Sequence, residues 1–267
     1  MKLAALALSI AALSASATES IFVQPEHTPV TVPAGYAAQV YTMLDGLSAD
    51  VSVPCSLPGP PVIITVGHPS ADTVARFPAL LAAAAACPHI IGLDLSPDEY
   101  GSGKSGESGY TPGQYATELC DAARATKATR LLVTFLALGQ AVLREDFIMP
   151  PCMDVVDGVA FDYYPSIPAP GQASADHIVG EVASIISKLK ALGARKVVYV
   201  YQAFKLQGES HADLFTRLAW QRLAIDAAGA LGADYVAPWG LNLSVQQMAA
   251  EPIVQLVGTD LEVLVKP

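Results

Sequence analysis

Charged residues are scarce in this chain, and positively charged ones are the scarcer kind. Only 15% of its 267 residues are charged, and 15 Lys and Arg against 25 Asp and Glu give a formal net charge of -10. Binding of nucleic acid or of an anionic membrane depends on clustered Lys and Arg that displace counterions. We therefore expect neither partner and look for a neutral or cationic one.

Several short motifs that define cofactor and metal sites are also missing. There is no G-x-G-x-x-G after a first strand and no C-x-x-C, H-x-H or H-E-x-x-H. The glycine-rich "GSGKSGES" fails as a phosphate-binding loop because the first glycine of that motif would fall on Asp98. No cofactor is expected. A metal-dependent hydrolase using His27, His68 and Asp94 is the least favoured alternative.

No apolar run approaches the roughly 20 residues that span a membrane. The apolar run from Leu3 to Leu13 follows one lysine and precedes Ala15-Ser16-Ala17, which is the pattern of a secretory signal peptide. We predict a signal peptide over residues 1–17 and a secreted or periplasmic protein. Residues 18–267 contain no linker that would separate two domains.

The four cysteines, Cys55, Cys87, Cys120 and Cys152, allow three disulfide connectivities. In an exported chain disulfides are permitted. We predict sequential pairing, 55 with 87 and 120 with 152.

Short β-branched runs alternate with longer helical patterns along the chain, which predicts a parallel sheet with helical crossovers. The strand candidates are "SIFVQP", "VIITVGH", "HIIGLDL", "RLLVTFLAL", "DGVAFDYYP", "KVVYVYQAF", "DYVAPWGL" and "DLEVLV". Eight strands favour a single-domain α/β fold, a (β/α)8 TIM-type barrel, over an open doubly wound sheet. "ADVSVP" is a further strand candidate.

Polar side chains gather where these strands end, which is where parallel α/β folds bind ligands. The two-residue period of a strand predicts that Ile91, Leu93 and Leu95 face the helices and that Asp94 faces inward. In the same way Asp162 and Tyr164 are predicted to face inward. Other strands end near Gln202, Trp239, His68, Glu26 and His27. Each of these residues could instead be a satisfied structural group.

Four segments resemble strand ends of secreted barrels of the glycoside hydrolase type: "IIGLDLSPDEY", "GVAFDYYPS", "VVYVYQAF" and "YVAPWGL". The resemblance implies that Glu99 is the general acid, with Asp98 beside it. It also implies a sugar site lined by Asp162, Tyr164, Gln202 and Trp239. The chain departs from the pattern at Gln202, since retaining enzymes of the best-known clan place a nucleophilic Glu on a late strand. It also lacks the Asp-x-Asp-x-Glu pattern of substrate-assisted chitinases, because Pro97 stands two residues before Glu99.

The sequence thus predicts a monomeric, secreted glycoside hydrolase acting on a poly- or oligosaccharide. Glu99 would be the acid and Asp162 the favoured second carboxylate, with Asp94 and Glu26 as the other candidates. His68 is expected near the substrate, and the Gly/Ser loop after Glu99 is expected to act as a lid. A non-catalytic carbohydrate-binding barrel is the alternative that the missing late-strand Glu leaves open.

Overall fold

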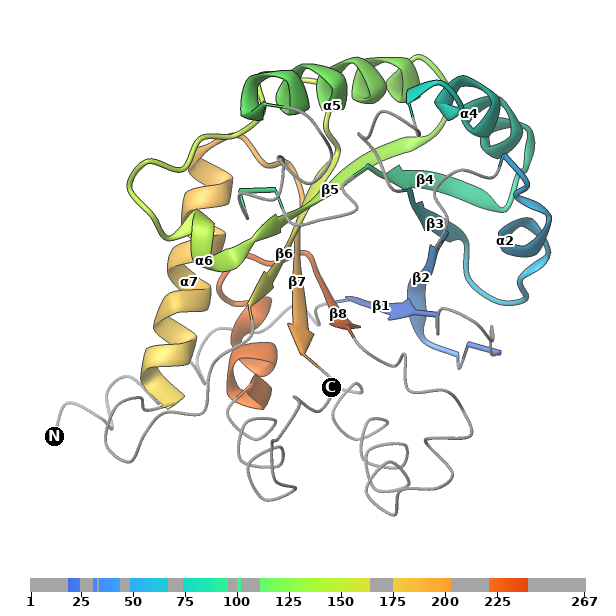
Figure 1. Ribbon diagram of the computed structural model, residues 1–267. Coiled ribbons are helices and arrows are strands. Elements are labelled where there is room, and N and C mark those ends of the chain that lie inside the picture. Colours follow the sequence, from blue (N-terminus) through green and yellow to red (C-terminus); the bar gives the residue numbers. More distant parts are fainter. Residues whose placement is uncertain are drawn as a thin grey trace, which may run out of the picture.

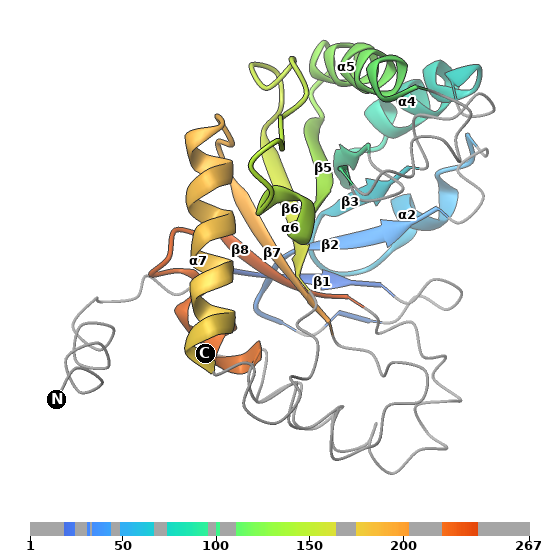
Figure 2. The same cartoon turned by 60° about the vertical axis from the view of Figure 1, so that its left-hand side comes forward.

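The computed structural model describes residues 19–24, 31–32, 34–43, 49–66, 74–95, 100–101, 111–163, 175–202 and 221–239. They form a closed barrel of eight parallel strands that pair in chain order, β1 finally pairing with β8 (Figures 1 and 2). The strands are β1 (Glu19–Val23), β2 (Tyr36–Thr42), β3 (Val62–Thr65), β4 (Ile90–Asp94), β5 (Leu132–Leu138), β6 (Gly158–Tyr163), β7 (Val197–Gln202) and β8 (Tyr235–Trp239). The (β/α)8 prediction is confirmed.

Helices cover the outside of the barrel (Figure 2). They are α2 (Ser52–Ser56), α4 (Phe77–Ala86), α5 (Pro112–Lys127), α6 (Gly139–Val142) and α7 (Ala175–Ala191), and residues 221–228 are also helical. The start of α5 and the end of α7 are as their sequences predict. Thr111 and Gln114 form a capping box ahead of α5. After α7 the chain turns at Gly193, where φ is 99°, a backbone conformation that glycine adopts without steric cost.

Two strand predictions change. "ADVSVP" is wrong as a strand because residues 52–56 form helix α2, and "DLEVLV" lies outside the described residues. The barrel instead contains β2, "YAAQVYT", which the sequence pattern did not indicate. Its central Gln39 is fully buried and binds three groups: Gln24 Nε2 donates to Gln39 Oε1 at 2.6 Å, and Gln39 Nε2 donates to the carbonyls of Pro58 and Pro60 at 3.1 and 2.7 Å. A polar residue can occupy a buried strand when its hydrogen bonds are satisfied in this way.

The apolar side chains form two clusters, one on each face of the sheet. The larger lies between strands and helices and includes Val133, Phe135, Phe161 and Tyr199. The smaller lies inside the barrel and contains Ile21, Val23, Ala38, Ile63, Val200 and Ala237, with Val40, Ile91, Leu136, Ala160, Val198 and Tyr235 packed against it. Membership of these clusters shows which face each strand residue occupies.

The N-terminal ends of two strands carry the same acidic clamp. Asp234 precedes β8, and its carboxylate accepts hydrogen bonds from the Val197 amide, Lys190 and Lys196 at 2.9, 2.8 and 2.8 Å. Asp157 precedes β6 and accepts from the Val133 amide at 3.0 Å and from Lys127 at 2.6 Å in an equivalent arrangement. Each clamp joins the residue before one strand to the adjacent, preceding strand, β7 in the first case and β5 in the second, so it stabilises the end of the barrel opposite the strand C-termini.

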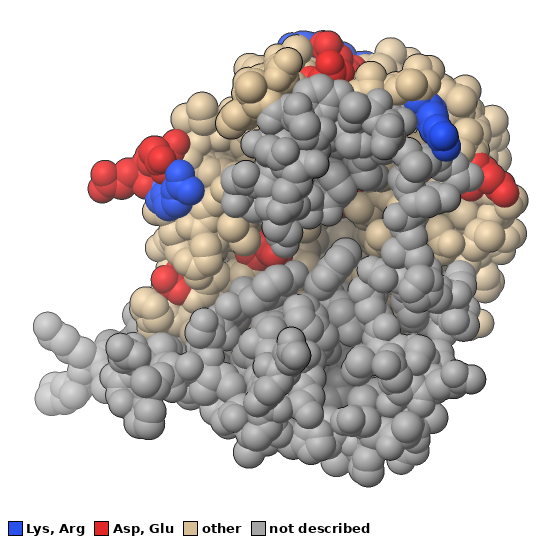
Figure 3. All heavy atoms as spheres, in the orientation of Figure 1, with Lys and Arg blue, Asp and Glu red and all other residues tan. Residues whose placement is uncertain are grey.

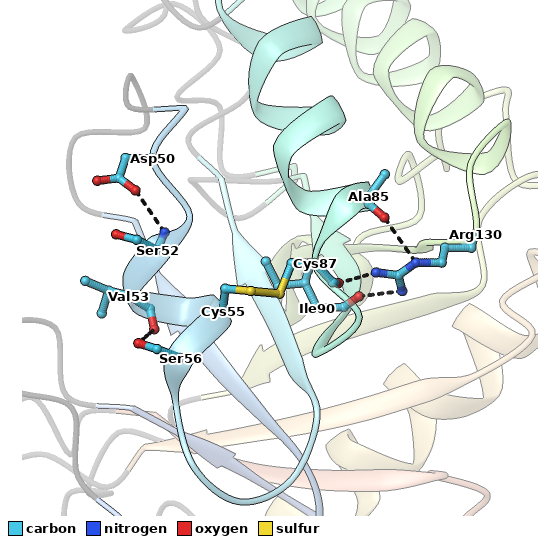
Figure 4. The surroundings of a disulfide bond; sticks show 9 residues. All are labelled: Asp50, Ser52, Val53, Cys55, Ser56, Ala85, Cys87, Ile90 and Arg130. Carbon is cyan, nitrogen blue, oxygen red and sulfur yellow. Dashed lines mark hydrogen bonds between the residues drawn. A yellow bond between two sulfur atoms is a disulfide. The ribbon is translucent and has the colours of Figure 1, made fainter.

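Two disulfides join Cys55 to Cys87 and Cys120 to Cys152, as predicted. The first ties α2 to the end of α4 (Figure 4). On the other side of this helix end, Arg130 donates to the carbonyls of Ala85, Cys87 and Ile90. Disulfides of this kind are typical of proteins from oxidising, extracytoplasmic compartments. No helix among the described residues is long and apolar enough to cross a membrane.

Candidate functional site at the C-terminal ends of the strands

Asp94 ends β4 and faces the barrel interior, as predicted. Its neighbour in register on β3 is Thr65, whose hydroxyl donates to Asp94 Oδ2 at 3.3 Å. The prediction for Ile91 is wrong, because this side chain packs against the interior cluster. The cause is a register irregularity: Val62 pairs with Ile90, but Ile63 pairs with Gly92. One additional β4 residue at Ile91 reverses the alternation there and restores it for Gly92 and Asp94.

Asp162 lies near the end of β6 and also belongs to the inward-facing set. It pairs in register with Val200, an interior residue of β7, and its relative exposure is only 1%. The amide of Gly139 donates to Asp162 Oδ1 at 3.4 Å. Gly139 comes directly after β5, and a Cβ atom there would lie 2.2 Å from the Asp162 carbonyl oxygen. Only glycine therefore permits this close approach of the two backbones.

The register places Asp162 nearer the mouth of the barrel than Asp94. Asp94 pairs with Thr134 on β5, and Thr134 pairs with Gly158 on β6, four residues before Asp162. The strands of an eight-stranded barrel are tilted, so paired residues on neighbouring strands differ in height along the barrel axis by about one residue. From β4 to β6 this tilt accounts for about two of the four residues. Asp162 lies roughly one inward-facing layer above Asp94.

Solvent reaches part of the barrel interior, at Asp94 but not at Asp162. The outward-facing Val133, Phe135 and Val159 have at most 1% exposure, whereas the inward-facing Leu136 and Ala160 are only half-buried. A side chain inside a closed barrel can meet solvent only in the interior space or through its ends. Asp94 is also half-buried and meets solvent, whereas Asp162 is 1% exposed.

The end of β6 is held from outside by α7. Tyr163, next to Asp162, is a buried member of the outer cluster, and its hydroxyl donates to Glu181 Oε2. Glu181 Oε1 lies 3.5 Å from His177 Nε2, one helical turn earlier on α7. Burial, together with the hydrogen bond to the Glu181 carboxylate, raises the pKa of Tyr163. Tyr163 therefore remains protonated and available as a donor.

Only part of the predicted site can be placed. Gln202 and Trp239 end β7 and β8 and pair with each other in register. The remaining predicted residues, namely Glu26, His27, His68, Asp98, Glu99 and Tyr164, lie outside the described residues, as do the signal peptide and most of the predicted lid. The structure brings Asp94 and Asp162 into one interior and pairs the backbones of Gln202 and Trp239 at its mouth.

Sequence reasoning missed Thr65, Gly139 and Glu181. Thr65 ends "VIIT" at the same relative position as Asp94 ends "IIGLD", so its inward direction was available from the two-residue period. The four-residue spacing of His177 and Glu181 is that of neighbours on one helix face. Nothing in the sequence indicated the role of Gly139, because its contact with Asp162 joins two strands.

The charges of the described residues form no large basic patch on the face drawn in Figure 3, where Lys and Arg lie in small groups near acidic side chains. Among the same residues, no three His, Cys, Asp or Glu side chains gather in a way that could hold a metal ion.

Comparison with known protein families gives no match, and no characterised protein sequence matches either. Solved structures do resemble the fold. A modular endo-β-1,4-mannanase from Cellulomonas fimi, described with glycoside hydrolase family 26 mannanases, has a TM-score of 0.58 and 14% identity over 88% of this chain and 71% of its own. GH26C from Muricauda sp. MAR_2010_75 has a TM-score of 0.52 and 9% identity over 88% and 82%. The Bacteroides uniformis β-glucuronidase has a TM-score of 0.51 and 9% identity over 77% of this chain and 26% of its own. At these identities the likeness establishes the fold alone: this chain is a (β/α)8 barrel.

Proposed function

We propose that this protein is a secreted glycoside hydrolase acting on a neutral poly- or oligosaccharide. The observation that carries the proposal is the pair of carboxylates, the half-buried Asp94 and the buried Asp162, that face a barrel interior otherwise lined mainly by apolar side chains. Glycoside hydrolysis requires two carboxyl groups, one protonated and one ionised, on either side of the scissile bond. The net charge of -10 is compatible with an uncharged substrate.

In this proposal Glu99 is the general acid and Asp162 the second carboxylate. The amide N–H of Gly139 points to Asp162 Oδ1, and such a donor stabilises the ionised carboxylate. Glu99 precedes Tyr100, which pairs with β5 on one side while Asp162 pairs with β5 on the other. The backbones of Tyr100 and Asp162 are therefore two strand spacings apart, each of about 4.8 Å.

The residue at the end of β7 bears on the mechanism. It is Gln202, and a carboxamide cannot form the glycosyl ester of a double displacement. We therefore propose a single displacement. Asp162 accepts a proton from a water molecule while the oxygen of that water attacks the anomeric carbon. At the same time the Glu99 carboxyl protonates the departing glycosidic oxygen. The product then has inverted configuration.

The test is an activity screen of the protein without residues 1–17 against poly- and oligosaccharides, with β-1,4-mannan first because mannanases share the fold. Glu99→Gln and Asp162→Asn should each lower kcat by at least about 100-fold, in line with the usual contribution of general acid–base groups. Asp121→Asn is the matched control, because this carboxylate is exposed and, among the residues that the structure describes, pairs only with Arg124 on its own helix. NMR of the first product should show the inverted anomer. Unchanged activity in both site variants would refute the assignment, and a retained anomer would refute the single displacement.

Gln202 also favours a second candidate, a barrel that binds carbohydrate without cleaving it. The same variants distinguish the two. An enzyme with Glu99→Gln loses turnover and still binds its oligosaccharide in calorimetry, whereas a binding protein shows no turnover before the substitution is made.

A further inference from the structure

The chain returns to the barrel at Tyr100 in a way that interrupts the usual ladder. Leu95 N donates to the Thr134 carbonyl at 2.9 Å, and the next rung, to the Leu136 carbonyl, comes from Tyr100 N at 2.7 Å. In a regular parallel pair that rung would come two residues after Leu95, from residue 97. Leu95 and Tyr100, the described residues on either side of positions 96–99, therefore bond to successive carbonyls of the same strand, β5.

Tyr100 is held on both sides of its peptide unit. Besides the bond from its N–H, its carbonyl accepts from the Leu138 amide at 3.0 Å, and it forms a parallel bridge with Ala137. On the opposite side of β5, Leu138 pairs in register with Asp162. Leu138 is thus a neighbour of Tyr100 on one side of β5 and of Asp162 on the other.

The Tyr100 ring fixes the same point from outside the barrel. Its centroid lies 5.6 Å from that of Phe135 and 6.1 Å from that of Phe147, both in edge-to-face geometry, and 6.2 Å from that of Tyr115 on α5. Aromatic pairs in this arrangement are worth about 0.5–1.5 kcal/mol beyond their buried area. Burial of the phenol among these rings raises the pKa of Tyr100.

The next residue admits only glycine. Gly101 has φ 91°, and a Cβ atom there would lie 2.9 Å from the Ala141 Cβ and 3.1 Å from the Phe147 ring. A side chain would face both backbone strain and collision with α6 and the segment after it. Tyr100 and Gly101 together form a two-residue lock, in which one residue supplies the ring and the other the turn.

We propose that this Tyr100–Gly101 lock is the positioning element of the active site, which fixes the chain that carries Glu99 against β5 at the level of Asp162. The inference rests on the proposed glycosidase function. It explains why Tyr100 combines strand-type hydrogen bonds with a ring directed into the outer cluster. Neither residue is assigned any contact with substrate, so both act through the residue that precedes them.

The lock can be tested without any activity. Tyr100→Ala removes the ring and Gly101→Ala introduces the collision, and each should accelerate hydrogen exchange at the Leu138 amide, resolved by NMR, by at least about tenfold. Tyr100→Phe keeps the ring and should exchange within about twofold of the natural protein. Leu189→Ala is the control for general loss of stability, since Leu189 is fully buried on α7 and lies outside the lock. If Tyr100→Ala leaves exchange at Leu138 unchanged relative to Leu189→Ala, the lock does not exist.

Positioning is tested by kinetics. With a substrate from the screen, Tyr100→Ala and Gly101→Ala should lower kcat at least about tenfold with KM changed less than about threefold, because misplacing an acid impairs the transition state more than binding. Tyr100→Phe and Leu189→Ala should keep kcat within about twofold. Faster exchange at Leu138 with unchanged kcat would overturn the positioning role while leaving the proposed function intact. If the natural protein cleaves nothing in the screen, the proposed function is refuted and the positioning role with it. The hydrogen-exchange data would still decide whether the Tyr100–Gly101 lock exists.

Discussion

The clamp at Asp234 gives a stability prediction that can be worked from its contacts. Asp234→Ala removes a carboxylate that accepts from the Val197 amide at 2.9 Å and from Lys190 and Lys196 at 2.8 Å each. The side chain is 20% exposed, and the two lysines are 36% and 56% exposed. The hydrogen bond from the Val197 amide therefore contributes more to the free energy of unfolding than the two ion pairs do.

The magnitude follows from these three contacts. A hydrogen bond to a charged group contributes about 1.5–3 kcal/mol, and an exposed ion pair contributes about 0.2–1 kcal/mol. Asp234→Ala should lower the free energy of unfolding by about 2 to 5 kcal/mol at pH 7. Asp234→Asn retains an acceptor for the Val197 amide and should cost less, about 1 to 2 kcal/mol.

The pH dependence has a definite sign. Burial alone would raise the pKa of Asp234, but the hydrogen bonds from Lys190, Lys196 and the Val197 amide outweigh burial and hold the pKa below its usual value. A carboxyl whose pKa is lower in the folded state stabilises the fold above its unfolded pKa, near 3.9. This stabilisation is lost as pH falls through the folded value. The difference between the natural protein and Asp234→Asn should therefore be full at pH 6 and clearly smaller at pH 2.5.

Urea unfolding at both pH values measures the effect, with the disulfides intact. Asp121→Asn, which loses only an exposed pair within one helix, should cost less than about 0.5 kcal/mol. A loss below about 0.5 kcal/mol for Asp234→Ala at pH 7, or a deficit in Asp234→Asn that persists unchanged at pH 2.5, would refute this account of the clamp.

Three further predictions concern contacts elsewhere. Removing either disulfide by a double Cys→Ser change should lower the free energy of unfolding by about 4 kcal/mol. The two losses should agree within about 1 kcal/mol because both bridges span 32 residues. Unequal losses in urea unfolding would contradict an origin in loop-closure entropy. Gly139→Ala should destabilise the fold by more than about 3 kcal/mol and reduce carbohydrate turnover, since its Cβ collides with the Asp162 carbonyl oxygen; native stability and activity together would show that the backbones are not in contact. Arg130→Ala, which leaves three carbonyls of the α4–β4 turn without their donor, should cost about 2 to 4 kcal/mol by thermal unfolding, and Arg130→Lys should recover only part of it, because an ammonium group cannot reproduce the guanidinium fork.

The barrel could be predicted because most of its strands are short, apolar and β-branched. β2 was the exception, since its interior contains two alanines and Gln39, residues that strands disfavour. Its stability comes from contacts that the local sequence does not contain, namely the amide of Gln24 and the carbonyls before β3. The disulfide pairing was predicted correctly from chain order.

The site was predictable where the strand period held and failed where the register shifted. Asp162 follows an unbroken alternation through β6 and faces inward as expected. On β4 the irregularity at Ile91 changes the face of one residue and leaves Asp94 where the pattern placed it.

Both disulfides fall within residues 55–152, so neither of them ties β1, β2, β6, β7 or β8 to another element. This division has a mechanical consequence. If the chain is pulled from its ends, the two segments of 32 residues closed by the bridges cannot extend. At roughly 3.5 Å per residue, the fully stretched oxidised chain should be about 200 Å shorter than the reduced one. The strands outside these two segments, including the last three, can lengthen completely under either condition, so the redox state sets how much of the barrel a force can extend.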